Sequence, residues 1–420
     1  MLTPSQRLFT NTAMKRSSLP AALAAAAFSF FQTSLHAADW PQWRGPNRDG
    51  ISTEKEWSPT WTADGPKQLW KANVGIGASS VAVAAGRLYT MGNANNTDSV
   101  VCLDAATGKE IWRHSYPQQL DKRMFEGGPA STPTVDGSHV FTLSQQGDIF
   151  CLDAATGKPV WHKNLASDFH GKRPQWGWAC SPLVERDMLI VDCGAPGEST
   201  IALDKATGAT KWKSGANDAG YGSPVAFNLG TVRCVAIFKA TSLVGLDAAT
   251  GQQLFEHPWK TSYDVNAATP VVSGDRIFIS SGYDAGCSLV QVSAGGAKSL
   301  WRNKNMRNHI NSCVLWQGHL YGIDGQAGGG TLRCLDFQTG SVKWTQSVNG
   351  GALMIADGKI ILLNERGELM VADASPAGFK PASRAQVIGG HCWVVPVLAG
   401  GKIYCKNNQG DLVCLNASGK

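Results

Sequence analysis

The sequence predicts an all-β fold, an eight-bladed β-propeller with four-stranded antiparallel blades, and three observations carry this prediction. A segment of the form Leu-Asp-Ala-Ala-Thr-Gly-x-x-x-Trp recurs along the chain, its copies are separated by the length of one propeller blade, and the two chain ends hold complementary parts of one copy. The composition agrees, because 47 Gly, 15 Trp and only 17% charged residues are typical of many short strands joined by tight turns.

The recurring segment has eight copies, spaced by 37 to 51 residues. The Asp of each copy, or the residue in its place, lies at Asp104, Asp153, Asp204, Asp247, Ser293, Asp336, Asp373 and Asn416. The Asp side chain suits a turn because it accepts hydrogen bonds from backbone N–H groups two or three residues later, and Gly108 supplies the positive φ that leads into the next strand. A second set of turns follows Ser-Pro or Thr-Pro pairs, as at Thr132-Pro133, so that each period holds four strands.

The two chain ends are predicted to share one blade. The last copy stops at Lys420 before its Trp strand, whereas residues 68–71 form a Trp strand with no copy before it. Joining these two parts leaves no exposed sheet edge. An open solenoid is the alternative, and it needs polar capping repeats, which the sequence does not show.

The first 37 residues have the pattern of a secretory signal peptide. Lys15 and Arg16 precede a short apolar stretch at 19–31, small residues at 34–38 form a cleavage region, and Met14 is a second candidate start. The apolar stretch is too short to span a bilayer, and no Cys stands at the cleavage point to carry a lipid. We therefore expect a periplasmic or secreted protein without a transmembrane segment after signal removal, with an N-terminal extension at 38–67 and the propeller at 68–420.

Charge and cysteines exclude some classes of function. The formal charge of +6 falls to +3 without Arg7, Lys15 and Arg16, which is too little to indicate a nucleic-acid partner. The 11 cysteines contain no haem-attachment or zinc pattern. Cys180 and Cys193 flank a predicted hairpin, where they form either a disulfide or two buried free thiols. Four others recur with the repeat and are predicted to be small buried side chains: Cys102, Cys151, Cys334 and Cys414.

The repeats resemble the pyrroloquinoline-quinone (PQQ) type propeller family, whose blades carry an Asp-x-x-Thr-Gly-x-x-x-Trp signature. The resemblance covers residues 68–420, and the segment 40–50 (WPQWRGPNRDG) is similar to the entry segment of exported members that are labelled similar to the outer-membrane assembly protein BamB. It implies that the Trp of each blade docks against the neighbouring blade, which is sensible because a large ring fills the space between twisted sheets. These Trp residues are Trp70, Trp112, Trp161, Trp212, Trp301 and Trp344.

The resemblance implies two functional branches. Quinoprotein dehydrogenases hold PQQ and a calcium ion on the propeller axis, commonly beside a disulfide between adjacent cysteines; this sequence has no Cys-Cys dipeptide and no clear Asp-Glu-Asn cluster for calcium. BamB-like members are non-catalytic and bind partner proteins at the cell envelope. We expect the second role, with no catalytic residues and no resident metal. The alternative is a PQQ-dependent alcohol or sugar dehydrogenase, and a carbohydrate-binding propeller is a third hypothesis.

The candidate site lies where the repeats differ. In a propeller the loops that lead into the inner strands form one rim of the axial channel. Their side chains either bind envelope proteins or a small ligand, or pack the channel wall. One insert, at 163–180, contains the basic cluster His170, Lys172 and Arg173, which is either solvated surface or part of a partner-binding loop. The candidate rim residues are Glu126, Trp176, Trp178, Tyr221, Asp264, Asn266, Arg307, His309, Asn311, His391 and Trp393.

Overall fold

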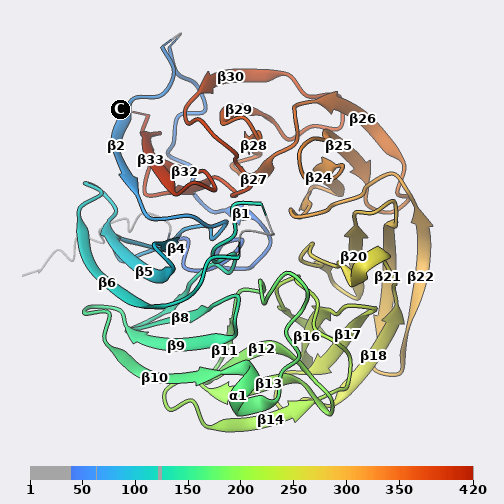
Figure 1. Ribbon diagram of the computed structural model, residues 1–420. Coiled ribbons are helices and arrows are strands. Elements are labelled where there is room, and N and C mark those ends of the chain that lie inside the picture. Colours follow the sequence, from blue (N-terminus) through green and yellow to red (C-terminus); the bar gives the residue numbers. More distant parts are fainter. Residues whose placement is uncertain (1–38, 63, 122–124, 420) are drawn as a thin grey trace, which may run out of the picture. The chain divides into compact units, whose positions relative to one another are not determined.

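The computed structural model describes residues 39–62, 64–121 and 125–419. In this part of the chain, eight sheets of four antiparallel strands surround a common axis, and one of them gains a fifth strand (Figure 1). The predicted eight-bladed propeller is confirmed. The predicted signal peptide falls outside the described residues, and no helix among those described is long and apolar enough to cross a membrane.

Blades 1 to 4 follow one another along the chain, each with its strands in sequence order. Blade 1 contains β3 (Ala82–Ala84), β4 (Arg87–Ala94), β5 (Thr97–Asp104) and β6 (Glu110–Pro117). Blade 2 contains β7 (Thr134–Asp136), β8 (His139–Leu143), β9 (Asp148–Asp153) and β10 (Pro159–Asn164), followed by helix α1 (Leu165–Phe169). Blade 3 contains β11 (Leu183–Glu185), β12 (Met188–Ala195), β13 (Glu198–Asp204) and β14 (Thr210–Ser214). Blade 4 contains β15 (Val225–Leu229), β16 (Val232–Phe238), β17 (Ser242–Asp247) and β18 (Gln253–Pro258).

Blades 5 to 8 complete the ring, after a short 3₁₀ turn at Ser262–Asp264. Blade 5 contains β19 (Val271–Ser273), β20 (Arg276–Ser281), β21 (Gly286–Ser293) and β22 (Gly296–Asn303). Blade 6 contains β23 (Val314–Trp316), β24 (His319–Asp324), β25 (Thr331–Asp336) and β26 (Val342–Ser347). Blade 7 contains β27 (Ala352–Ala356), β28 (Lys359–Leu363), β29 (Glu368–Asp373), β30 (Pro381–Gln386) and, parallel to β27, β1 (Ile51–Ser52). Blade 8 contains β31 (Val397–Ala399), β32 (Lys402–Lys406), β33 (Asp411–Asn416) and β2 (Gln68–Asn73).

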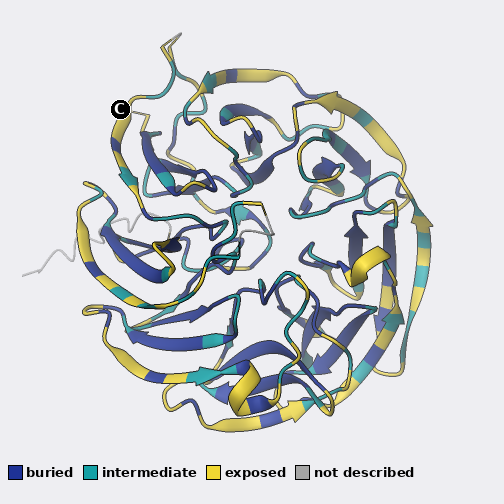
Figure 2. Cartoon of the chain, in the orientation of Figure 1, coloured by how far each residue is buried: buried dark blue, intermediate teal, exposed yellow. Residues whose placement is uncertain are grey.

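The blades are buried at the axis and exposed at the circumference (Figure 2). In blade 1 the short inner strand β3 is wholly buried, whereas the outer strand β6 is mostly exposed and has one buried side chain, Trp112. Blade 8 joins the two chain ends as predicted, because β2 pairs antiparallel with β33 and places Gln68 opposite Leu415 and Trp70 opposite Cys414. This pairing completes the eighth blade and so closes the ring of blades.

In blades 1 to 7 each recurring segment forms the connection between the third and fourth strands of its blade. In blade 1 the Asp104 Oδ1 atom accepts hydrogen bonds from the backbone N and the Oγ1 of Thr107, both at 2.8 Å. Gly108 then turns the chain with φ of +71°. These bonds keep the Asp104 carboxylate charged and lower its pKa, the Thr107 hydroxyl being the largest cause.

The outer-strand Trp side chains connect neighbouring blades. Each indole N–H donates to a backbone carbonyl of the next blade, at N–O distances of 2.9 to 3.3 Å. The ring also lies on the glycine of the next hairpin: a Cβ on Gly108 would stand 2.6 Å from the Trp70 ring, and one on Gly157 would stand 2.5 Å from the Trp112 ring. Glycine is therefore required here both for its φ and for close ring packing. The donor and acceptor pairs are Trp70 and Ala105, Trp112 and Ala154, Trp161 and Lys205, Trp212 and Ala248, Trp301 and Phe337, and Trp344 and Ser375.

The junction between blades 7 and 8 is different. Blade 7 carries Ser383 opposite Val371, in the register where blade 1 has its Trp. The N-terminal extension fills this junction, because Ser58 N donates to Ala417 O at 2.7 Å and the neighbouring Trp57 is only 7% exposed. An extension residue thus makes the inter-blade hydrogen bond that a Trp makes elsewhere.

The cysteines contribute to the core as side chains of moderate size. All 11, including Cys180 and Cys193, are buried free thiols. Burial raises the pKa of Cys180 and of Cys151 to about 12, so both thiols stay protonated at neutral pH.

Candidate functional site

One end of the axis is filled by residues 40–52, which we name the axial plug. The plug lies at the centre of the ring, where Figure 1 shows β1. It makes hydrogen bonds to every blade, and its partners in blades 1 to 8 are Val83, Val135, Ser181 with Pro182, Pro224, Thr269, Cys313, Ile355 and Leu398. A segment that is local in sequence therefore ties together blades from the whole chain.

Two buried arginines hold the plug. Arg48 is 3% exposed and donates to the carbonyl oxygens of Ser181, Pro182 and Pro224. Arg44 donates to Cys313 O at 2.7 Å. Burial lowers the pKa of Arg48 to about 9 and that of Arg44 to about 10, so both guanidinium groups remain charged at neutral pH.

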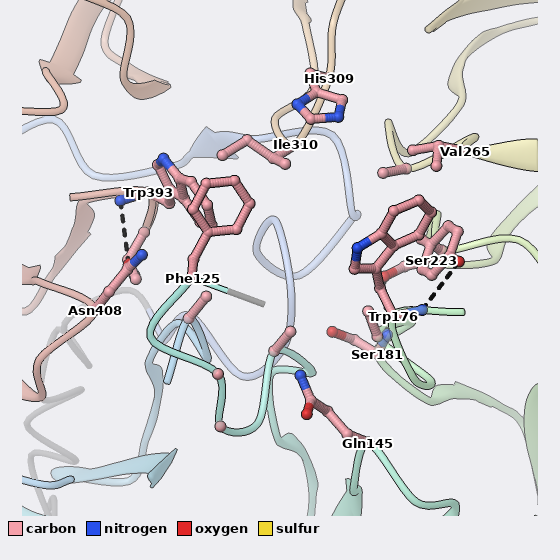
Figure 3. A pocket seen from close by; sticks show the side chains of 18 of the residues that line it. Phe125, Gln145, Trp176, Ser181, Ser223, Val265, His309, Ile310, Trp393 and Asn408 are labelled. Atoms are coloured by element: carbon pink, nitrogen blue, oxygen red, sulfur yellow. Dashed lines mark hydrogen bonds between the residues drawn. The ribbon is translucent and has the colours of Figure 1, made fainter. Parts of the chain in front are cut away.

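A cavity of about 230 Å³, which we name the axial cavity, lies where the chain enters the inner strands. Trp43 of the plug is part of its lining, so the plug closes its inner end. Figure 3 shows Phe125 and Trp393 on one side of the cavity and Trp176 on the other. The Phe125 and Trp393 rings are 4.6 Å apart and nearly perpendicular. Aromatic side chains from loops of different blades therefore stand on both sides of the cavity.

A chain of hydroxyl groups sets the position of the loops around this cavity. Ser80 N donates to Thr132 Oγ1, Thr132 N to Ser181 Oγ, and Ser181 N to Ser223 Oγ, at 2.9 to 3.2 Å. Each hydroxyl belongs to the blade that follows its donor. The recurring Ser-Pro and Thr-Pro pairs thus supply acceptors between blades as well as turns.

Three aromatic residues at the mouth have strained backbones. Phe125, Tyr263 and Tyr283 have φ of +56°, +65° and +52°, a region that bulky residues rarely occupy. Phe125 and Tyr263 are also 64% and 66% exposed. Such strain persists only where the surrounding structure holds it, and it gathers at binding and switch sites.

Glu126 is the acidic group of the cavity lining. Its carboxylate contacts His391 Nδ1 at 3.0 Å, Asn408 Nδ2 at 3.2 Å and Gln409 Nε2 at 3.0 Å. Burial alone would raise the pKa of Glu126, but hydrogen bonds led by Asn408 outweigh it and lower the pKa. The carboxylate is therefore charged at neutral pH. His309 also belongs to the lining, and burial lowers its pKa, so its imidazole is neutral at neutral pH.

The structure brings part of the predicted rim together. Five of the eleven predicted residues line the axial cavity: Glu126, Trp176, Tyr221, His309 and Trp393. His391 lies directly beside them, with its ring 4.3 Å from that of Trp393 and its Nε2 3.8 Å from Glu365 Oε2.

Six predicted residues lie outside the lining: His391, Arg307 and four that are buried or exposed elsewhere. Trp178 is a core residue, 1% exposed, whose indole donates to Cys193 O at 3.2 Å. Asn266 and Asn311 are buried and donate to backbone carbonyls, Asn311 to Gly351 O at 2.8 Å. Asp264 is exposed beside Tyr263. The side chains of these four residues thus point away from the cavity or hold the backbone.

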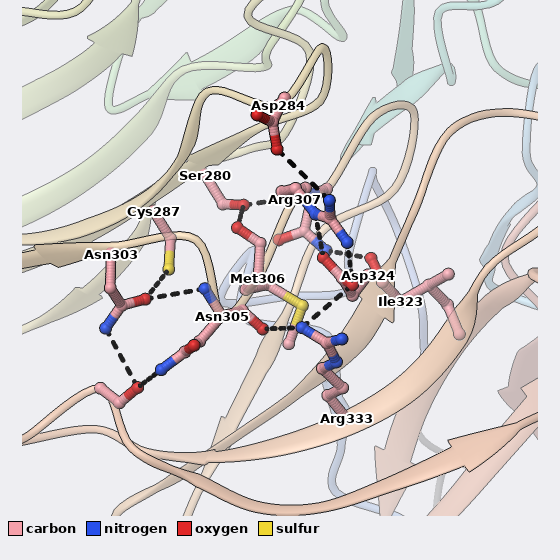
Figure 4. A network of polar contacts seen from close by, with 12 residues as sticks. Ser280, Asp284, Cys287, Asn303, Asn305, Met306, Arg307, Ile323, Asp324 and Arg333 are labelled. Atoms are coloured by element: carbon pink, nitrogen blue, oxygen red, sulfur yellow. Dashed lines mark hydrogen bonds and ion pairs between the residues drawn. The ribbon is translucent and has the colours of Figure 1, made fainter.

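Arg307 pairs with carboxylates between blades 5 and 6 (Figure 4). Its Nε and Nη2 lie 2.9 and 2.8 Å from the two oxygens of Asp324, and its Nη1 lies 3.3 Å from Asp284 Oδ1. Arg333 Nη1 adds a second cation 3.0 Å from Asp324 Oδ2. The hydrogen bonds with Asp324 raise the pKa of Arg307, and the network fixes the rim loop instead of presenting a charge to the cavity.

Sequence reasoning missed several residues of the lining. Trp43, Phe125, Gln145, Tyr283 and Asn408 also line the cavity. Gln145, Tyr283 and Asn408 lie in hairpins between second and third strands, which reach the same end of the blade as the loops before the inner strands. The repeat predicts four antiparallel strands in each blade, so strand direction alone would have placed these hairpins at the same end of the blade as the candidate loops.

The comparisons with known proteins agree with this architecture. The family model described as outer membrane protein assembly factor BamB matches residues 61–128 and 97–346. The chain belongs to the BamB family of PQQ-like repeat propellers. The BamB of Burkholderia pseudomallei (strain K96243) is 26% identical over 287 residues, in a match that covers 58% of this chain and 70% of that protein.

Solved structures show how widely the fold is shared. BamB from Moraxella catarrhalis is 16% identical with a TM-score of 0.61, covering 84% of this BamB-family chain and 98% of that one. Quinohemoprotein alcohol dehydrogenase from Comamonas testosteroni is 15% identical with a TM-score of 0.65, covering 91% and 81%. At these identities the likeness concerns the fold, which a binding protein and an enzyme both use.

PQQ with calcium does not fit the described lining of this BamB-family cavity. PQQ is a tricarboxylate, and the described lining offers Glu126 but neither Lys nor Arg to compensate three buried anionic groups. Among the described residues, no group of three His, Cys, Asp or Glu side chains is placed to hold a metal ion. No reaction step is therefore assigned to this cofactor.

Proposed function

We propose that this BamB-family propeller is an exported, non-catalytic binding protein of the cell envelope that holds partner proteins at the open end of its axis. The supporting observation is the exposed aromatic rim: Phe125 and Tyr263 stand in solvent around a cavity whose other end is plugged. Exposed rings bordered by polar groups are typical of protein interaction sites, and buried aromatic anchors dominate their affinity. The relative from Burkholderia pseudomallei is named as an outer membrane protein assembly factor. We propose that the partners of this chain are likewise proteins of the cell envelope.

Site-specific photo-cross-linking in cells tests the binding surface. A photo-reactive amino acid is placed at Phe125 or Tyr263 and, as a matched control, at Val160, which is 47% exposed on the outer strand β10. We expect discrete adducts with envelope proteins from both rim positions and none from Val160. Equal adducts from all three positions would contradict a binding site at the rim.

Cell fractionation tests export. The full chain is expected in the periplasmic fraction or the medium, and replacing both Lys15 and Arg16 by Glu should retain it in the cytoplasm, because a signal peptide needs a positive start. A full chain found in the cytoplasm would contradict the envelope role.

A dye-linked oxidation assay tests the absence of catalysis. The purified protein is incubated with PQQ and calcium and then offered alcohols and sugars. We expect no dye reduction above the rate without protein. PQQ-dependent turnover would overturn the non-catalytic role and support a dehydrogenase.

A further inference from the structure

We propose that the axial cavity binds an alkylated ammonium group, of the kind carried by choline, between the rings of Phe125, Trp176 and Trp393 and near the carboxylate of Glu126. The proposal deepens the proposed binding role of the rim and rests on it. It names an organic cation as the ligand class of the cavity, and three observations support it.

The first observation is the arrangement of the aromatic rings. Phe125 and Trp393 come from the loops before blades 2 and 8, and Trp176 comes from the loop before blade 3. Figure 3 shows these rings on opposite sides of the same space. An organic cation within about 6 Å of an aromatic ring is attracted by the negative face of the ring, most strongly where water is excluded. A quaternary ammonium group also buries methyl groups, which matches an apolar wall.

The second observation is the charge of the lining. Glu126 is a charged carboxylate, His309 is neutral, and the described lining contains no Lys or Arg. Behind Glu126, one imidazole (His391) stands between two carboxylates, those of Glu126 and Glu365. This distribution favours a cation in the cavity and disfavours an anion.

Two basic side chains of the described rim are paired with carboxylates. Lys172 Nζ lies 2.5 Å from Asp218 Oδ2, and Arg307 is held by Asp324. These carboxylates offset the positive charge of Lys172 and Arg307 and so reduce its repulsion of an incoming cation.

The third observation is the backbone strain at the aromatic positions. Phe125 and Tyr283, both in the lining, hold positive φ values that cost stability for side chains of this size. Phe125 is nevertheless 64% exposed as a residue, so burial of its own surface does not offset this cost. Strain that fixes exposed rings at a cavity mouth is expected where those rings contact a ligand.

Calorimetric titration of the full exported protein tests the proposal. The probes are choline and tetramethylammonium, and the matched control ligand is 3,3-dimethylbutan-1-ol, which has nearly the shape of choline without its charge. We expect choline to bind at least about tenfold more tightly than the neutral alcohol, since cation–π and carboxylate attraction act on the charge alone. Equal affinity for both, or no heat from either cation at millimolar concentration, would overturn the proposal.

Two variants locate the binding. Glu126→Gln and, separately, Trp393→Leu should each weaken choline binding about tenfold or more, whereas Glu110→Gln on the outer strand β6 should leave it unchanged. Thermal unfolding of each variant identifies any loss of fold; if Glu126→Gln unfolds, Trp393→Leu alone decides. Choline affinity that is unchanged in a folded Trp393→Leu protein would contradict the cavity as its site.

Pelleting with lipid vesicles distinguishes two sources of the alkylated ammonium group, a lipid headgroup and a free small molecule. If the protein binds free choline and also phosphatidylcholine vesicles but not phosphatidylglycerol vesicles, the ligand is a lipid headgroup. If it binds free choline alone, the ligand is a small molecule. Both outcomes support an organic cation as the ligand. Preference for phosphatidylglycerol would overturn it. Rim adducts with envelope proteins that form without any choline affinity would retain the proposed function and reject only this inference.

Discussion

The plugged end and the open end of the axis differ in how their polar groups are satisfied and in which side chains stand on strained backbone. At the plugged end, Arg48 lies among carbonyl oxygens of two blades and is satisfied by them. At the open end, Phe125 and Tyr283 keep strained backbones, and the buried Trp393 Nε1 has no hydrogen-bond partner among the described residues. Positive φ occurs at both ends, since Arg44 and Arg48 of the plug have φ of +61° and +56°, but at the open end it falls on bulky aromatic residues, of which Phe125 is exposed. Strain on exposed aromatic residues at a cavity mouth is typical of a site maintained for binding rather than for stability.

The largest predicted effect concerns the plug. Arg48→Ala should lower the free energy of unfolding by about 3 kcal/mol or more, because it leaves the buried carbonyls of Ser181 and Pro224 without this donor, whereas Pro182 O keeps the Thr134 hydroxyl. Arg113→Ala, which removes an exposed ion pair with Glu110 on the outer strand β6, is the control and should cost less than about 1 kcal/mol. Urea unfolding measures both. Similar losses in the two variants would show that the plug is not a major source of stability.

Two buried lysines sharpen the comparison. Lys239 Nζ, 1% exposed, lies 2.5 Å from the Asp192 carboxylate and also contacts Ser199 and Thr200. Lys406, equally buried, donates to Gly77 O, next to Ala78 in the cavity lining. Burial without a compensating carboxylate lowers the pKa of Lys406 to about 7.

Lys406→Met should therefore stabilise the protein, and more at low pH. The pKa of Lys406 is lower in the folded state (about 7) than in the unfolded state (near 10.5), so the cost of the buried charge is complete below pH 7 and disappears as the pH rises toward 10.5. The gain from Lys406→Met should shrink by about 3 kcal/mol between pH 6.5 and 9.5. Lys239→Met should instead destabilise, since it leaves Asp192 buried and unpaired. Unfolding midpoints across this pH range test the contrast, and a gain that does not vary with pH would contradict it.

The outer belt of the blades provides a smaller test. Gly157→Ala places a Cβ 2.5 Å from the Trp112 ring at φ of +72°, whereas Gly137→Ala in the same blade, at φ of +56°, meets nothing within 4 Å. Both changes strain the backbone by about 1 kcal/mol, and only Gly157→Ala should cost about 1 to 3 kcal/mol more from the collision. Equal losses of stability would show that Trp112 moves aside without cost.

These contrasts also explain what the sequence could predict. The blades were predictable because each hairpin depends on residues close in sequence, such as Asp104, Thr107 and Gly108, and because the pattern repeats. The closure of the ring followed from two incomplete copies. The plug was not predicted, because its contacts join residues far apart in sequence, for example Arg48 and Pro224 at a separation of 176 residues.

The candidate site was predictable only as a set of loops. Non-repetition identified Glu126, Trp176 and Trp393, which line the cavity. The same criterion selected Trp178 and Asn266, whose side chains turn into the core or bind the backbone, because a loop position does not determine a side-chain direction. Phe125 was missed although it directly precedes Glu126, since its exposure depends on a positive φ that Phe rarely takes.

The smallest expected change in stability, at the rim, separates binding from folding most clearly. Phe125→Gly relieves the positive φ by about 1 kcal/mol and loses one ring contact with Trp393 of similar size, so the unfolding free energy should change by less than about 1 kcal/mol. Phe125→Leu keeps the strain and removes only the ring, which makes it the matched variant. Both should lose choline affinity in calorimetry while remaining folded. A loss of several kcal/mol in Phe125→Gly would mean that this ring supports the fold, and the difference between the two ends of the axis would then no longer separate stability from binding.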